Sequence, residues 1–109
     1  MFVYDPEPKF THPVTAHVPA DGGHEAQTFN ATFRVMGDTQ LGTFDMNDRA
    51  STVAFLREVL VGFGDVEDAA KQPVVFSDRT RDWLIDLPYT RAALVKGYFG
   101  GVYKAALGN

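Results

Sequence analysis

The sequence contains no cysteine, which excludes a disulfide framework, a thiolate zinc site and a thiol nucleophile. No apolar run approaches the roughly 20 residues that a membrane-spanning helix needs. The net charge is −4 and no cluster of Lys or Arg is present, so nothing favours binding to nucleic acid or to an anionic membrane. The chain opens without the basic and long apolar regions of a signal peptide. We therefore expect a cytoplasmic protein.

The composition that is present suits a folded globular chain. The 109 residues provide enough chain for one domain. Hydrophobic residues make up 45%, charged residues 22% and aromatic residues 13%, values that argue against disorder and supply bulk for a core. Residues 1–10 include two prolines and alternate in charge, which predicts an extended, loosely held arm. We expect one domain over residues 1–109 that begins with this arm.

The first half of the chain predicts a β-hairpin. Residues 13–19 and 26–36 alternate between apolar and polar side chains, as half-buried strands do. Asp-Gly at residues 21–22 is a turn signal between them. Two strands leave two open edges, which are natural places for self-association or for capture of an extended partner segment. Alternatively, the N-terminal arm adds a third strand, or proline and charge blunt the edges.

The second half predicts helices near residues 46–63, 78–86 and 89–107, because apolar side chains recur there three and four residues apart. Asp45 and Ser77 are the expected N-caps of the first two helices. The fold class is thus α+β, an N-terminal β-hairpin packed against about three α-helices. The expected core comprises Phe29, Phe33, Val53, Leu56, Leu60, Trp83, Leu84, Val95 and Phe99.

Pro88 suits the first turn of the third helix, but Gly97, Gly100 and Gly101 fall inside it. Glycine within a helix costs about 1 kcal/mol relative to alanine, so a structural reason is expected. Either the helix breaks at Gly100–Gly101, or a neighbouring backbone, from the same chain or a partner, packs closely there. A phosphate-binding loop is excluded, since no strand precedes these glycines and no Lys-Ser/Thr follows them.

Few residues suggest chemistry. His12, His17 and His24 are possible ligands for a divalent metal, but their spacing matches no known ligand motif. We expect them on a solvent-facing strand and turn. The carboxylates of residues 65–68 lie in a polar loop without the aromatic wall that would separate two pKa values for acid–base catalysis. No catalytic triad or metalloprotease motif is present, so we expect no enzyme, cofactor or metal.

Three segments in succession resemble the tail assembly chaperones of tailed bacteriophages and prophages. They are PVTAHVPADGGHEAQTFNATFRVM, FLREVLVGFGDVED and PVVFSDRTRDWLIDLPYTRAALVKGYFGGVYKAALGN. Together they cover roughly residues 10–109, and their order and spacing are more specific than any one of them. The sequence departs from the family pattern at Phe63, where many relatives have Trp, and in its glycine-rich last helix.

The resemblance implies a non-enzymatic protein of the bacterial host's cytoplasm. Such a chaperone binds the long, helical tape measure protein and keeps it soluble until tail tube subunits polymerise around it, which makes the tail tube protein a further partner. Two alternatives stay open: a structural component of the tail or virion, and a small metal- or ligand-binding accessory domain built around the three histidines.

The expected partner surface combines the hairpin edge with the exposed side of the last helix, and we expect a homo-oligomer to use it too. That helix carries more apolar side chains than a single inward-facing stripe can bury. The expected inward stripe is Val95, Phe99, Val102 and Ala106. The expected partner-binding residues are Leu94, Tyr98, Gly101 and Tyr103. Gly97 and Gly101 would let a partner helix approach closely. Alternatively, the tyrosines cap the rim of the core.

Overall fold

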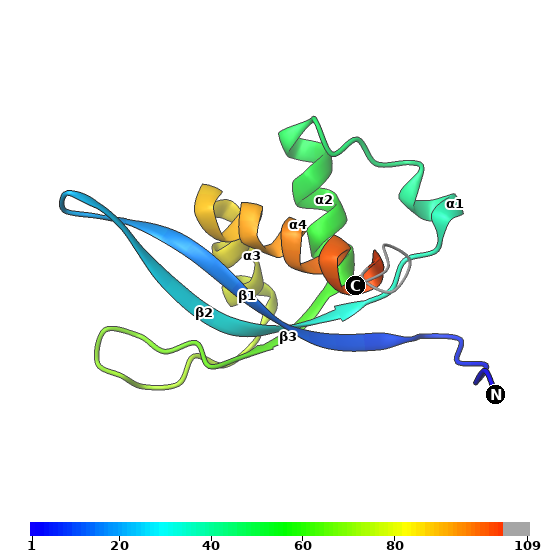
Figure 1. Cartoon of the computed structure of the whole chain (residues 1–109), viewed down its shortest axis with the longest axis horizontal. Coiled ribbons are helices and arrows are strands. Elements are labelled where there is room, and N and C mark those ends of the chain that lie inside the picture. The colour runs from blue at the N-terminus through cyan, green and yellow to red at the C-terminus, as the bar shows by residue number, and fades with distance from the viewer. Residues whose placement is uncertain (104–109) are drawn as a thin grey trace.

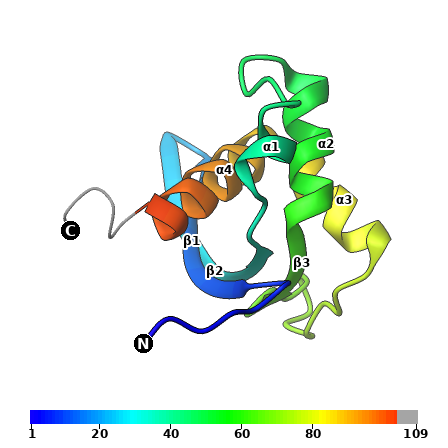
Figure 2. The same cartoon turned by 90° about the vertical axis from the view of Figure 1, so that its right-hand side faces the viewer.

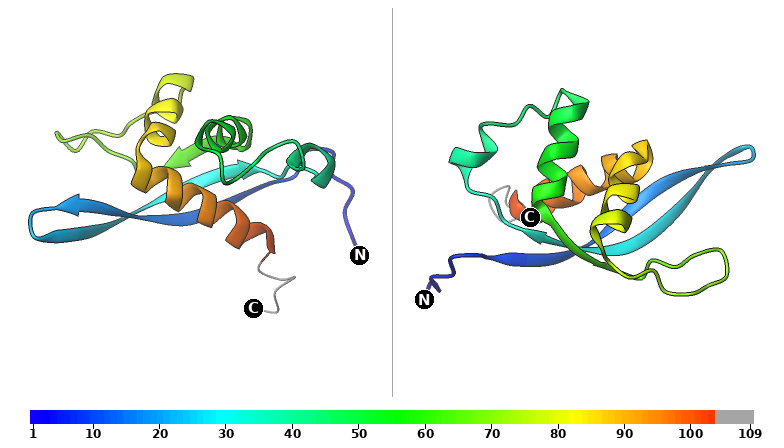
Figure 3. Two further views of the ribbon diagram at one scale, coloured as in Figure 1. Left: turned by 90° about the horizontal axis from the view of Figure 1, so that it is seen from above. Right: turned by 180° about the vertical axis from the view of Figure 1, so that it is seen from behind.

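A long hairpin and a short third strand form one antiparallel sheet in the computed structural model, which describes residues 1–103 (Figure 1). β1 (Lys9–Ala20) pairs along its whole length with β2 (Gly23–Arg34). β3 (Leu60–Gly64) pairs with the other side of β2, so β1 and β3 are the two edges. Gly22 allows the tight turn because it adopts a φ of 80°. The predicted hairpin is confirmed, but β1 begins at Lys9, so residues 9–10 belong to the sheet and the arm predicted over residues 1–10 is limited to residues 1–8. The turn end of the hairpin projects beyond the helices (Figure 3).

The helices lie on one side of this sheet (Figure 2). They are α1 (Asp38–Leu41), α2 (Arg49–Val59), α3 (Asp78–Asp86) and α4 (Pro88–Tyr103). The predicted α+β class, an N-terminal hairpin packed against helices, is therefore confirmed. The short α1 was not predicted, and the predicted end of the last helix at residue 107 lies outside the described residues. Within residues 1–103, no helix is long and apolar enough to cross a membrane.

The prediction of a helix over residues 46–63 is wrong at both ends. Asp48, not Asp45, is the N-cap of α2, and its carboxylate accepts a hydrogen bond from the Ser51 N–H. The helix ends at Val59 and the chain continues as β3. The open side of β2 supplies backbone partners for these residues, while two glycines within five positions weaken a helix there. Pairing with β2 therefore replaces the last helical turn.

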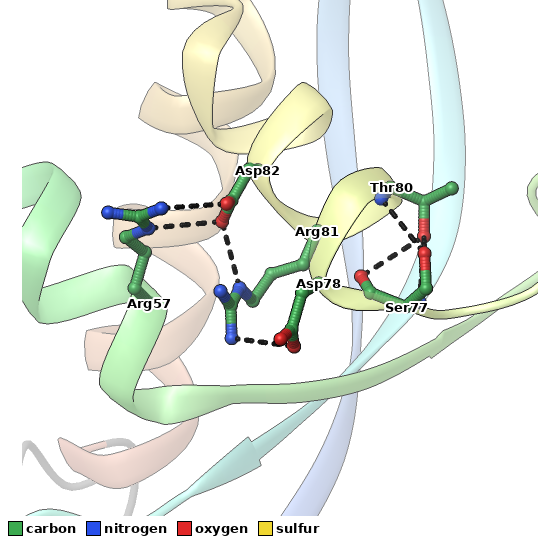
Figure 4. A network of polar contacts seen from close by, with 6 residues as sticks. All are labelled: Arg57, Ser77, Asp78, Thr80, Arg81 and Asp82. Atoms are coloured by element: carbon green, nitrogen blue, oxygen red, sulfur yellow. Dashed lines mark hydrogen bonds and ion pairs between the residues drawn. The ribbon is translucent and has the colours of Figure 1, made fainter.

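The predicted starts of α3 and α4 are confirmed. Ser77 caps α3 in a capping box: its hydroxyl accepts from the Thr80 N–H at 3.2 Å, and the Thr80 hydroxyl accepts from the Ser77 N–H at 2.8 Å (Figure 4). Pro88 opens α4, where its missing N–H removes no helical hydrogen bond.

The core lies between the sheet and the helices. Five of the predicted core residues are buried, namely Phe29, Phe33, Leu56, Leu60 and Leu84. Val53, Val95 and Phe99 are only partly buried against this core. The placement of Trp83 in the core is wrong, since this residue is 56% exposed on the surface of α3.

The glycines of α4 serve close packing within the chain. The helix is continuous through Gly97 and Gly101, so the alternative of a break at Gly100–Gly101 does not apply and the alternative of close packing does. A Cβ at Gly97 would overlap the Val14 side chain, and one at Gly101 would overlap the ring of Phe10. Both neighbours belong to β1, so side chains of the strand, not a backbone, fill the space that the glycines leave.

Candidate partner-binding site

Two of the predicted partner-binding residues lie in the core. Leu94 is 0% exposed and Tyr98 is 1% exposed. The Tyr98 hydroxyl accepts a hydrogen bond from the Met36 N–H at 3.0 Å. Its ring packs edge-on against Phe33 and Phe55, and burial raises the pKa of the Tyr98 hydroxyl. The prediction that Leu94 and Tyr98 turn outward is therefore wrong.

The other two predicted residues do not complete a partner surface. Gly101 lies beneath the Phe10 ring of its own chain, so a partner helix cannot approach it closely. Tyr103 is 37% exposed and stacks on Phe99 with ring centroids 6.1 Å apart. Of the four residues, only Tyr103 stays at the surface among the residues that the structure describes.

The rotation of α4 explains this outcome. Apart from Arg91 and Lys96, apolar side chains occur all round the helix, so hydrophobic spacing does not identify its inward face. The buried stripe is Thr90, Ala93, Leu94, Gly97 and Tyr98. The predicted inward residues Val95, Phe99 and Val102 flank that stripe and are half-buried, and Ala106 lies outside the described residues. The sequence feature that could have identified the inward face is the pair Gly97 and Gly101, because close approach to β1 requires glycine on the inner side.

The structure places an apolar groove elsewhere, between the sheet, the loop after β3 and the junction of α3 with α4. This open cavity has a volume of about 420 Å³. Its apolar walls are Val18, Phe29, Val66, Trp83, Leu87 and Tyr89. We refer to it as the Trp83 groove. Its volume lies within the range of ligand-binding clefts, and apolar residues make up the larger part of its lining.

The junction of α3 with α4 fixes one wall of the Trp83 groove. The Thr90 hydroxyl donates to the carbonyls of Leu84 and Leu87. The Arg91 guanidinium donates to the Ile85 carbonyl at 3.0 Å. The bonds to Leu84 and Ile85 satisfy carbonyls in the last turn of α3, which have no partner within the helix. Because Leu84 and Ile85 point into the core, the preceding Trp83 is directed outward.

The loop after β3 forms the opposite wall and has its own internal bonds. Asp65 adopts a φ of 60° and its carboxylate accepts from the Asn30 side-chain amide at 2.8 Å. The Asp68 carboxylate accepts from two backbone N–H groups of the loop. The carboxylates of this loop are exposed, which confirms the predicted solvated loop. Two of them, Asp65 and Glu67, lie on the rim of the Trp83 groove.

An ion-pair network supports the helix that carries Trp83 (Figure 4). Arg57 of α2 donates two hydrogen bonds to the Asp82 carboxylate, at 2.7 and 3.1 Å. Arg81 donates to the same carboxylate at 3.0 Å and pairs with Asp78 at 3.4 Å. Hydrogen bonds from Arg57 and then Arg81 lower the pKa of Asp82 from 3.8 to about 2. The network ties α3 to α2 beside the groove.

The histidines are dispersed along the hairpin. His12 is half-buried beside α4, whereas His17 and His24 are exposed on the strands. Within residues 1–103, no three His, Cys, Asp or Glu side chains lie close enough together to hold a metal ion. Every buried polar side-chain atom in this part of the chain has a hydrogen-bond partner.

No family model, curated protein or solved structure matches this chain.

Proposed function

We propose that this chain is a non-enzymatic tail assembly chaperone of a tailed bacteriophage or prophage, and that it binds the tape measure protein in the cytoplasm of the bacterial host. The observation that carries the proposal is the Trp83 groove, in which a 56% exposed tryptophan stands over an apolar cleft. Exposed aromatic side chains at such a cleft are typical anchors of protein interfaces.

An amphipathic helix is the occupant that fits this groove best. Before tail tube subunits cover it, a long helical tape measure protein exposes an apolar stripe that requires a partner. A helix places one apolar residue per turn into a cleft of this kind. Asp65 and Glu67 on the rim favour a helix whose apolar stripe is flanked by Lys or Arg, because complementary rim charges speed and orient association. The tail tube protein is a further partner in the same pathway.

Co-expression with the tape measure protein of the same phage tests the proposal. We expect a tagged copy of this chain to retain the tape measure protein in the soluble fraction and to co-purify with it. Trp83→Ala should abolish both effects while leaving the fold intact by circular dichroism, since Trp83 lies outside the core. Val75→Ala is the matched control, because Val75 is 78% exposed and lies outside the groove lining. If folded Trp83→Ala still co-purifies at the level of Val75→Ala, the groove is not the binding site.

Purified virions separate the chaperone from a structural tail component. A chaperone leaves the tape measure protein as the tube polymerises, so we expect mass spectrometry of virions to lack this chain. Its presence at the copy number of a tube or connector subunit would contradict the proposal and support the structural alternative.

A further inference from the structure

The N-terminal arm, residues 1–8, carries the most exposed apolar segment in the described chain. Met1, Phe2, Val3 and Tyr4 are each at least 71% exposed. Single exposed apolar residues are ordinary, but a contiguous run marks an interaction site. The arm leaves the molecule at the end opposite the hairpin turn (Figure 1). The arm therefore has apolar area to bury and is directed away from its own core.

Within residues 1–103, no strand pairs with the outer edge of β1. The Pro8 carbonyl accepts from the Val35 N–H at 2.9 Å, so in this antiparallel pair the even-numbered residues of β1 bond to β2. The odd-numbered residues then direct their N–H and C=O groups to the open edge. Pro13 and Pro19 are both odd-numbered, and this is the side on which a strand tolerates proline. Between them, Thr15 and His17 present backbone donors to a further strand.

A second cavity of about 270 Å³ follows the same edge, between β1 and α4. On the α4 side its floor is made of small residues, Ala93, Gly97 and Gly100, which leaves room for side chains of an added strand. Lys96 and His17 also line it, and neither β1 nor α4 contains a carboxylate residue. The charged side chains of the arm before β1 are Asp5 and Glu7. The arm and this edge are therefore complementary in charge.

We propose that the N-terminal arm of a second copy of this chain adds as a strand to the open edge of β1. In this arrangement Val3 lies opposite Thr15, and the two residues exchange backbone hydrogen bonds. Directly paired residues in a sheet point to the same face, so Phe2 and Tyr4 lie on the face of Val14, above α4. Their rings then occupy the cavity, whereas Asp5 and Glu7 lie on the face of Thr15, away from Lys96, so that charge favours the approach of the arm and not a specific ion pair.

The arm of the same copy cannot make this contact. To reach this edge, the arm would have to turn back just before β1, near Glu7. Residues equally far from the turn then lie opposite each other, which places Met1 opposite Pro13. Thr15 and His17 stay out of reach. The contact with a second copy leaves the Trp83 groove open, so this inference goes beyond the proposed function and does not depend on the client.

Sedimentation equilibrium of the intact chain and its variants tests the proposal. We expect self-association of the wild-type chain and its loss on deletion of residues 1–5. Thr15→Pro should weaken association about tenfold, since it removes the outward N–H that bonds to the arm. Thr15→Ala is the matched control: it loses the same hydroxyl, which bonds to Thr28 at 2.8 Å, but keeps the N–H and should associate like wild type. A monomeric wild type, or unchanged association after the deletion, would overturn the proposal.

Cross-linking locates the contact, because the natural chain contains no cysteine. A Val3→Cys chain and a longer-tagged Thr15→Cys chain should form a mixed disulfide when oxidised together. Paired positions bring the two Cα atoms within the distance that a disulfide spans. The control mixes the Val3→Cys chain with a longer-tagged Lys71→Cys chain, whose cysteine lies in the loop after β3. A yield no higher than that of the control would refute the register even if the chain self-associates.

Discussion

Replacing Gly97 by alanine is the most direct perturbation of the contact between α4 and β1. Glycine inside a helix usually marks lost stability, and alanine at such a position gains about 1 kcal/mol of helix propensity. Here the new methyl group would overlap Cγ1 of Val14. The substitution therefore sets a known backbone gain against a specific steric cost.

The structure indicates that the steric cost exceeds the gain. Val14 is 2% exposed and is β-branched, so its side chain has little freedom to rotate away. Either β1 or α4 must shift, and overpacking of a closed core typically costs 1–3 kcal/mol, with larger values where the backbone moves. After the gain in propensity of about 1 kcal/mol, we expect Gly97→Ala to lose up to about 2 kcal/mol of unfolding free energy.

Gly100→Ala is the matched control in the same helix. Among residues 1–103, a Cβ at Gly100 meets no atom within 4 Å outside the backbone of its own helix, so this variant should gain up to about 1 kcal/mol from propensity alone. Urea unfolding followed by circular dichroism at neutral pH measures both variants. In a Val14→Ala background, Gly97→Ala should lose most of its cost, because the overlapping methyl group is gone. If Gly97→Ala is as stable as Gly100→Ala, the inferred packing of α4 on β1 is incorrect.

Three further substitutions test the core and the ion-pair network. Phe33→Ala should cost about 3–5 kcal/mol in urea unfolding, because Phe33 is fully buried, and a loss below about 1 kcal/mol would contradict the assigned inner face of β2. Tyr98→Phe should cost about 1–3 kcal/mol by leaving the Met36 N–H unpaired in the core, and an unchanged melting temperature would exclude that bond. Asp82→Asn should destabilise by at most about 1 kcal/mol at neutral pH, since Asp82 and Arg57 are partly exposed. The folded pKa of Asp82 is about 2, below the ordinary 3.8, so the stabilisation is complete above about pH 5 and should be mostly lost as the pH falls to about 2; a constant difference between wild type and variant over that range would contradict it.

The local features of this fold could be predicted from the sequence alone. The alternation of β1 and β2, the Asp-Gly turn, the Ser77 cap and the start of α4 at Pro88 all depend on residues close together in the chain. Side-chain alternation, capping hydroxyls and the fixed φ of proline act over a few residues and need no distant partner. The acidic residues after β3 could be assigned to a solvated loop for the same reason, because a short polar segment is recognisable from its own residues.

The end of α2 depended on a distant partner. A helical stripe of apolar residues continues through Leu60 and Phe63 in the sequence. The structure places these residues in β3, because β2 offers an open edge some 30 positions earlier in the chain. Backbone groups need hydrogen-bond partners in a helix and in a strand alike. Pairing with β2 favours the strand, and the local spacing of apolar residues does not encode that pairing.

The candidate site was decided by tertiary structure for the same reason. The Trp83 groove draws its walls from the hairpin, the loop after β3 and the junction of α3 with α4, which no spacing along the chain connects. On α4, several rotations of an evenly apolar helix bury similar hydrophobic area, so composition alone could not choose among them. Close packing of β1 side chains against Gly97 and Gly101 selected one rotation, and with it Leu94 and Tyr98 became core instead of surface.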